Sequence, residues 1–304
     1  MTVCGFKFEV RVLRYKCPAS YCHALQTSNL KPDFRNFIRT AARMNKIDLT
    51  DSLEKIPVKI FPGSAEGSAF VAKQIASLIK QKEKEGKKAV IGLATGSSPK
   101  TLYAELVRMH KTEGLSFKNV IAFNLDQYYP MDKDALQSYH YFMRKNLFEH
   151  TDIDPANYHL PDGMIPKDKV KEHCLEYEQK IEGAGGIDFQ ILGIGLNGHI
   201  GFNEPGSSLY SKTRLINLDT ITRNANAREF ANISKVPRLA LTAGISTIMK
   251  AKRIILLGWG NKANIIAKSV EGHVTEQIPA SILQQHTNCT FVLDEIAASE
   301  LTRF

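Results

Sequence analysis

A histidine and a carboxylate follow a glycine-rich turn in the second half of the chain. The run Ile187–Leu192 is apolar apart from two residues, which is typical of a buried strand. His199 and Glu204 come soon after it, separated from the strand by three glycines, Gly193, Gly195 and Gly198. An imidazole titrates near neutral pH, and a nearby carboxylate can hold one of its tautomers. The stretch therefore predicts a site of proton transfer.

The same glycines match the dinucleotide fingerprint G-x-G-x-x-G, and Asp219 stands where the ribose-binding acid would be. That fingerprint requires a helix to begin at the third glycine, so that the helix N-terminus faces the pyrophosphate. Gly201, Pro205 and Gly206 disfavour an immediate helix. The motif alone is a weak signal, so we favour a catalytic loop over a nicotinamide site.

Two further segments follow buried strands. Thr95, Gly96, Ser97 and Ser98 come after the strand 89–94, with Ser98 as the expected N-cap and Pro99 as the first helical residue. Such a loop can bind phosphate through free backbone N–H groups, although an ordinary capped turn explains it as well.

Asp126 ends the strand 120–125 and precedes Tyr128, Tyr129 and Pro130, which we expect to prolong the loop. A simple helix cap explains this carboxylate poorly, because no helix begins nearby.

Strands alternate with helices along the chain, which predicts an α/β fold with three αβα layers and a doubly wound, mostly parallel sheet. It is Rossmann-like but without dinucleotide binding. Further strands are expected at 56–61, 214–218, 239–243, 253–259 and 290–293. Helices are expected at 64–84, 99–111, 136–150, 166–182, 260–272 and 294–303. The three polar segments all follow strand ends, so they should meet at the carboxyl edge of the sheet, where open α/β sheets bind ligands.

Composition narrows the class of protein. The chain has 304 residues, 43% of them hydrophobic, and no apolar run of the roughly 18 residues that cross a bilayer. Five cysteines without C-x-x-C spacing indicate reduced thiols and a cytoplasmic location. No residue cluster has metal-ligand spacing and no G-x-S-x-G elbow occurs, so we expect neither a metal site nor an acyl-enzyme.

Positive charge is concentrated at the N-terminus. Residues 1–50 carry nine Lys or Arg against three Asp or Glu, which is +6 of the net +9. We interpret residues 1–55 as a basic, poorly ordered extension rather than a nucleic-acid-binding domain, and residues 56–304 as the catalytic domain. No nucleic acid and no membrane partner are expected.

Three motifs carry a resemblance to a known family. The segments L-A-T-G-S-S-P, F-N-L-D-Q-Y-Y and G-I-G-L-N-G-H-I-G-F-N-E-P resemble the signatures of glucosamine-6-phosphate deaminases, in the same order. The resemblance runs from about Lys59 to Thr302 and implies conversion of glucosamine 6-phosphate and water to fructose 6-phosphate and ammonia, without a cofactor.

The resemblance also implies roles. His199 would open the sugar ring, with Asn197 and Glu204 orienting it, and Asp126 would move a proton from C2 to C1. Gly96, Ser97 and Ser98 (with Thr95 beside them) would bind the phosphate together with Arg228 and Lys262.

The chain departs from the family pattern at several positions. Asn197 replaces an aspartate of some members, Gln127 a glutamate and Ser97 a glycine, while Ile216 and Asn217 give no support for allosteric control. Members with the N-L-D-x-Y-Y-P variant can continue into a second, deacetylase-like domain, which would begin where this chain stops. A sugar-phosphate sensor and a 6-phosphogluconolactonase-like hydrolase are the alternatives, and a homo-oligomer is compatible with the sequence.

Overall fold

The computed structural model describes residues 56–302. The expected basic extension, residues 1–55, lies outside the described residues. Within 56–302, a seven-stranded sheet forms the centre, with strand order β1-β10-β9-β6-β2-β3-β5 and every neighbouring pair parallel. Its strands are β1 (Val58–Phe61), β2 (Ala89–Leu93), β3 (Val120–Asn124), β5 (Tyr158–His159), β6 (Phe189–Gly193), β9 (Ile254–Gly258) and β10 (Cys289–Asp294).

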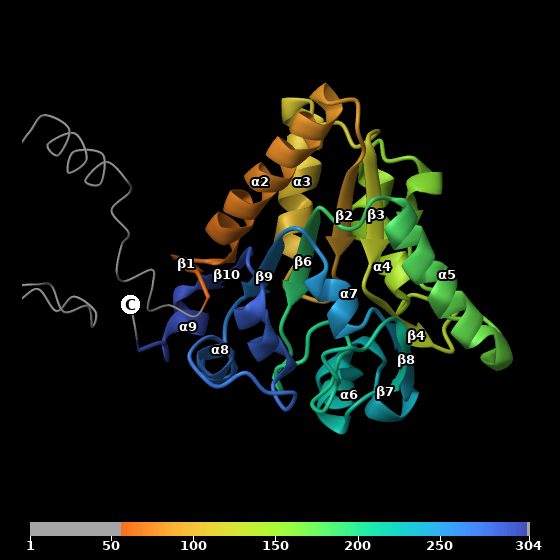
Figure 1. Ribbon diagram of the computed structural model, residues 1–304, viewed down its shortest axis with the longest axis vertical. Helices are drawn as coiled ribbons and strands as arrows, with labels where there is room; N and C mark the ends of the chain where they lie inside the picture. The colour runs from red at the N-terminus through yellow and green to blue at the C-terminus, as the bar shows by residue number, and fades with distance from the viewer. Residues whose placement is uncertain (1–55, 303–304) are drawn as a thin grey trace, which may run out of the picture. The chain divides into compact units, whose positions relative to one another are not determined.

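Helices cover both faces of this sheet, which confirms the predicted α/β class. The α-helices are α2 (Ser64–Lys84), α3 (Lys100–Glu113), α4 (Tyr139–Asn146), α5 (Val170–Gly183), α6 (Thr220–Asn226), α7 (Ile245–Met249), α8 (Ala263–Val270) and α9 (Glu295–Ala298). Helices α2 and α3 lie side by side (Figure 1). Parallel crossovers are right-handed, so α2 and α3 share one face, while α5 and α8, which belong to crossovers in the opposite direction, cover the other. Strand β2 is buried along its whole length, as a strand between two helical layers must be.

A second, smaller sheet stands next to the carboxyl edge of the first. It contains β4 (Asp126–Tyr129), β8 (Leu239–Thr242) and β7 (Arg214–Asn217), all antiparallel. Figure 1 shows these strands together with α6 beyond the ends of β2 and β6. The expectation of a loop after Asp126 is wrong, because β4 pairs with β8 over all four residues. The strands predicted at 214–218 and 239–243 are present as β7 and β8, each one residue shorter, but they do not join the parallel sheet.

Several helix ends differ from the sequence prediction. Pro99, not Ser98, is the N-cap of α3, and no side chain caps that helix. The helix expected at 136–150 is divided into α4 and the 3-10 turn η3 (Phe148–His150), and the last helix stops at Ala298. The prediction also missed β5, α6, α7 and the 3-10 helix η8 (Pro279–Gln285), because such short elements have no periodic pattern of their own. In the part of the chain that the structure describes, no helix combines the length and apolar character needed to cross a membrane.

The order of strands in the main sheet reverses between β2 and β6. Strands that follow β2 are added on one side, β3 and then β5, whereas those that follow β6 are added on the other, β9 and then β10. The loops after β2 and β6 therefore leave the sheet in opposite directions, and a crevice opens between them. This switch point is where open α/β sheets bind ligands.

A buried glutamate fastens the small sheet to its surroundings. Glu178 on α5 accepts hydrogen bonds through Oε1 from the backbone N–H of Thr213 (2.8 Å), from the Thr213 hydroxyl (2.5 Å) and from the Thr247 hydroxyl on α7 (2.6 Å). Thr213 directly precedes β7, so one carboxylate oxygen connects α5, α7 and the small sheet. All three donors are buried and would lose their partner together.

We expect Glu178→Ala to lower the free energy of unfolding by about 2 to 3 kcal/mol, because it leaves buried donors unsatisfied. Urea denaturation measures this change. Glu176→Ala, an exposed change on the same helix, is the matched control and should have little effect. Equal stability of the two variants would contradict the role of Glu178.

Candidate functional site

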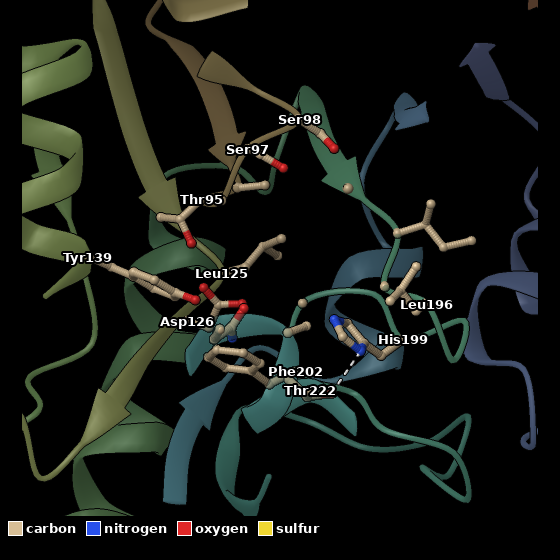
Figure 2. Close-up of a pocket in the computed structure, with 18 of the residues that line it drawn as sticks. Thr95, Ser97, Ser98, Leu125, Asp126, Tyr139, Leu196, His199, Phe202 and Thr222 are labelled. Atoms are coloured by element: carbon tan, nitrogen blue, oxygen red, sulfur yellow. Dashed lines mark hydrogen bonds between the residues drawn. The ribbon is translucent and has the colours of Figure 1, made fainter. Parts of the chain in front are cut away.

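A cavity of about 370 Å³ occupies the switch point. Its walls come from the loop after β2, the junction of β3 and β4, the loop after β6, helix α6 with the following turn η6 (Ala227–Glu229), and Lys262 before α8. Figure 2 shows Ser97 and Ser98 along one wall, with Asp126 and His199 facing the same space from two sides. Segments far apart in the sequence thus form one pocket.

One end of the cavity is suited to an anion. Gly96 has φ +89°, a backbone conformation that residues with a Cβ rarely adopt. Apart from its two chain neighbours, no residue has an atom within 4 Å of the position that a Cβ would take. The loop that passes through Gly96 therefore leaves open space. Next to it, Lys262 Nζ donates to the backbone oxygen of Ile194 (2.7 Å) and lies 3.4 Å from Ser98 Oγ. A hydroxyl, a cation and a glycine turn meet at this end.

The cation at this end is largely withdrawn from water. Burial lowers the pKa of Lys262, and the charge of Asp294 opposes that shift only in part. A desolvated ammonium gains more from a bound anion than an exposed one does. Arg228 on η6 also lines the cavity but is exposed, so it can approach an anion from the solvent side.

Asp126 stands at the opposite wall with its carboxylate buried. The residue is 5% exposed, and its Oδ1 has no hydrogen-bond partner among the described residues. Burial raises the pKa of Asp126 to about 7. The Tyr139 hydroxyl points toward Asp126 and Thr95 in Figure 2. A carboxylate with a pKa near neutral and an open path to the cavity has the properties of a general base.

His199 belongs to a hydrogen-bonded relay. Its Nδ1 lies 2.7 Å from Asn197 Oδ1 and 3.5 Å from Glu204 Oε2. Asn197 Nδ2 donates to the same Glu204 oxygen at 2.8 Å. Because the Asn197 amide nitrogen is used as a donor, its Oδ1 must accept, and the proton on the imidazole is therefore at Nδ1. The other ring nitrogen, Nε2, faces the cavity (Figure 2) and is the acceptor atom of the neutral imidazole.

Glu204 is the charged member of this relay. Burial acts to raise the pKa of its carboxyl group, but hydrogen bonding and charge from His199, with further hydrogen bonds from Thr222 and Asn197, outweigh it and lower the pKa. The carboxylate stays ionised and stabilises positive charge on the imidazole while a proton passes through it.

The structure explains why glycine is present at positions 195 and 201. A Cβ at Gly195 would overlap the ring of His199, so only glycine lets the imidazole pack on this backbone. Gly201, at φ +58°, turns the chain beside Asp126; a Cβ there would lie 3.5 Å from Asp126 Oδ2. Of the three fingerprint glycines, Gly195 is therefore explained by imidazole packing, and Gly198 by its φ of +84°.

The structure brings the ten predicted site residues together, although two of them do not line the cavity. Eight of them line the cavity: Thr95, Gly96, Ser97, Ser98, Asp126, His199, Arg228 and Lys262. Asn197 and Glu204 lie behind the imidazole and contact it instead. Sequence reasoning missed other lining residues: Tyr139, Phe202, Ile221, Thr222, Asn226 and Glu229. Tyr139 belongs to the helix expected at 136–150, and it is buried while still reaching the pocket.

The geometry agrees with what comparison with known proteins shows. The family described as glucosamine-6-phosphate isomerases/6-phosphogluconolactonase matches residues 63–292. The chain belongs to this family. The match contains every residue placed in the cavity or relay above.

Named relatives within the family are similar over most of this chain. A glucosamine-6-phosphate deaminase-like protein of Bacteroides thetaiotaomicron is 48% identical over 252 residues, which cover 83% of this chain but only 38% of that protein. The glucosamine-6-phosphate deaminase of Thermoanaerobacter pseudethanolicus is 47% identical over 230 residues, covering 75% of this chain and 90% of the relative. This chain thus spans well under half of the first relative and most of the second.

Solved structures of other proteins are similar to this chain in fold. A monomeric glucosamine-6-phosphate deaminase superposes with a TM-score of 0.77 at 43% identity, over 81% of this chain and 100% of the other. A 6-phosphogluconolactonase of Thermotoga maritima has a TM-score of 0.61 at 20% identity, over 78% and 99% of the two chains. The second likeness concerns the fold alone.

We expect Lys262→Met to weaken binding of inorganic phosphate about tenfold or more, because it removes the buried cation and keeps the length of the side chain. Isothermal calorimetry measures the dissociation constant. Lys268→Met, an exposed change on α8, is the matched control and should leave it unchanged. Equal binding by both variants would exclude Lys262 from the anion site.

The raised pKa of Asp126 predicts a pH dependence of stability. Between the ordinary carboxyl pKa of about 4 and the folded value of about 7, the native state holds a proton that the unfolded state has lost. This group therefore favours the folded state below about pH 4 and loses that contribution as pH rises to about 7.

We expect the free energy of unfolding of Asp126→Asn, relative to wild type, to increase between pH 4 and pH 7. Denaturation at each pH measures the difference, which isolates Asp126 from other titrating groups. A difference that does not change over this interval would show that Asp126 has an ordinary pKa.

Proposed function

We propose that this protein is a glucosamine-6-phosphate deaminase, which converts D-glucosamine 6-phosphate and water to D-fructose 6-phosphate and ammonia. Relatives of that name are 47% to 48% identical over most of this chain. The observation that carries the proposal is a single cavity with an anion site at one end and two proton-transfer groups, Asp126 and His199, facing its interior.

The phosphate of the substrate occupies the end with Gly96, Ser98 and Lys262. Backbone N–H groups of the loop and the Ser98 hydroxyl donate to its oxygens, and Lys262 supplies a desolvated positive charge. Arg228 completes the site from η6. Holding the phosphate fixes the sugar along the cavity, so that its first two carbons lie between Asp126 and His199.

Ring opening is assigned to His199. Its unprotonated Nε2 accepts the proton of the C1 hydroxyl and returns a proton to the ring oxygen as the C1–O5 bond breaks, which gives the open-chain aldehyde. The imidazole is transiently cationic during this step. Glu204 stabilises that charge through Asn197, and Nδ1–H stays fixed on Asn197 Oδ1.

Isomerisation is assigned to Asp126. The carboxylate removes the C2 proton of the open chain, which gives an enolamine, and the same group delivers the proton to C1. The product is an imine at C2. Addition of water to this imine and loss of ammonia give fructose 6-phosphate. A base with a pKa near 7 both removes and returns a proton readily, since neither form is strongly favoured.

No observation favours the two alternatives. Lactone hydrolysis transfers no hydrogen between carbons, and the lactonase structures share only the fold at 17% to 21% identity. A sensor domain needs to bind a sugar phosphate but needs neither a base with a raised pKa nor a histidine relay. The proposal includes a catalytic domain formed by residues 56–304, no cofactor, and a cytoplasmic location, which is supported by the free, buried thiols of Cys174 and Cys289.

We expect the purified protein to release ammonia and fructose 6-phosphate from glucosamine 6-phosphate in equal amounts. Asp126→Asn should lower kcat about a thousandfold, the range typical of a lost general base, while the substrate still binds. The wild-type kcat/KM should rise with pH through about 7, because the carboxylate form of Asp126 is the base. An enzymatic assay of ammonia and fructose 6-phosphate measures the product ratio, the kcat of Asp126→Asn and the pH dependence of kcat/KM.

Asp168→Asn, an exposed change, is the control and should keep full activity. Hydrolysis of 6-phosphogluconolactone without deamination would contradict the proposal, as would tight binding of the sugar phosphate with no turnover in the wild type. Full turnover in Asp126→Asn would assign the base to another group.

A further inference from the structure

The polar side chain of Thr222 is buried against the imidazole relay. Thr222 lies in the first turn of α6 and is 2% exposed. Its Oγ1 lies 3.2 Å from His199 Nδ1, on the side of the ring away from Nε2. A buried hydroxyl placed on a ring nitrogen needs a defined partner for its own proton.

The direction of each hydrogen bond can be assigned from the donors present. The His199 Nδ1–H is already directed to Asn197 Oδ1, so Thr222 Oγ1 can only accept a share of that proton. The hydroxyl proton must then go to another acceptor. Glu204 is the acceptor beside it, because Glu204 Oε2 lies 3.5 Å from the same Nδ1 that Thr222 Oγ1 contacts, and Thr222 is among the groups that lower the Glu204 pKa. Thr222 Oγ1 thus contacts the same ring nitrogen that Asn197 contacts, from a different element.

The same carboxylate also binds the start of α6. Glu204 Oε1 accepts a hydrogen bond from the backbone N–H of Asp219 at 3.1 Å, and Asp219 caps α6 through Ile221 N–H (2.6 Å). At its other end, α6 leads directly into η6, which carries Arg228 into the cavity. One continuous segment therefore joins the relay to the cation that faces the anion site.

We infer that Thr222 is a positioning residue, whose hydroxyl bridges His199 to Glu204 and fastens α6 to the imidazole. The hydroxyl holds the ring from a second element, whereas Asn197 holds it from the same loop. This inference rests on the proposed function only for its kinetic consequence. The fastening of α6 is a property of the folded protein and can be measured without substrate.

The test compares Thr222→Val with Thr222→Ser. Valine keeps the branched shape and has a similar helix propensity, so it removes the hydroxyl with little other change. Serine keeps the hydroxyl and loses only a methyl group. Thr220→Val, an exposed change in the same turn of α6, is the matched control.

We expect Thr222→Val to lower kcat for glucosamine 6-phosphate about tenfold, the effect of one hydrogen bond, with KM within about twofold of wild type. Backbone hydrogen exchange of residues 220–226, measured by mass spectrometry, should become about tenfold faster in this variant. Thr222→Ser and Thr220→Val should resemble the wild type in both measurements.

The inference is overturned if Thr222→Val keeps wild-type kcat and exchange, or if Thr222→Ser is impaired as strongly as Thr222→Val, since the methyl group would then be the important part. A wild type that releases no ammonia refutes the proposed function alone. In that case the exchange measurement still decides whether Thr222 fastens α6.

Discussion

The functional geometry depends on the reversal of strand order between β2 and β6. Parallel strands end at one edge, and the loops that leave β2 and β6 must diverge because the chain is wound in opposite directions from this point. The crevice needs no special sequence to exist. The chain then uses it by placing glycine-containing loops after both strands, so that backbone and small side chains line the opening instead of filling it.

Burial then gives the polar groups in the crevice their chemical character. Asp126 and Lys262 are opposite charges at different walls, and each is disfavoured in its ionised form by the low polarity around it. For Asp126 the result is a carboxyl group with a pKa raised to about 7, which is the property that the proposed base requires. For Lys262 it is a cation that gains strongly from a bound anion. The folding energy of the surrounding sheet, helices and buried Glu178 network offsets the cost of holding both groups out of water.

The small antiparallel sheet and α6 form the other side of the site. Strand β4 follows β3 after a single residue, Leu125, so the chain that delivers Asp126 continues at once into the second sheet. Helix α6 follows β7 in that sheet and is anchored to Glu204. Asp126 and Arg228 are thus connected through the small sheet and α6, whereas the loop at 95–98, the relay after β6 and Lys262 follow strands of the main sheet. Glu204 joins the relay to the start of α6. The cavity lies between these two parts.

The sequence by itself determined the class of fold and eight of the residues that line the cavity. Apolar runs without alternation indicate strands that are covered on both faces, and polar residues directly after such strands have only one edge at which to meet. Asp126, His199 and the loop at 95–98 could be predicted in this way. Tertiary structure alone decided the pairing of β4, β7 and β8 in a separate sheet, because strand pairing over long sequence distances leaves no periodic signal. It also decided that Tyr139 and Thr222 reach the site. Their helices have ordinary patterns, and only packing determines which buried hydroxyl faces the core and which faces an imidazole or a carboxylate.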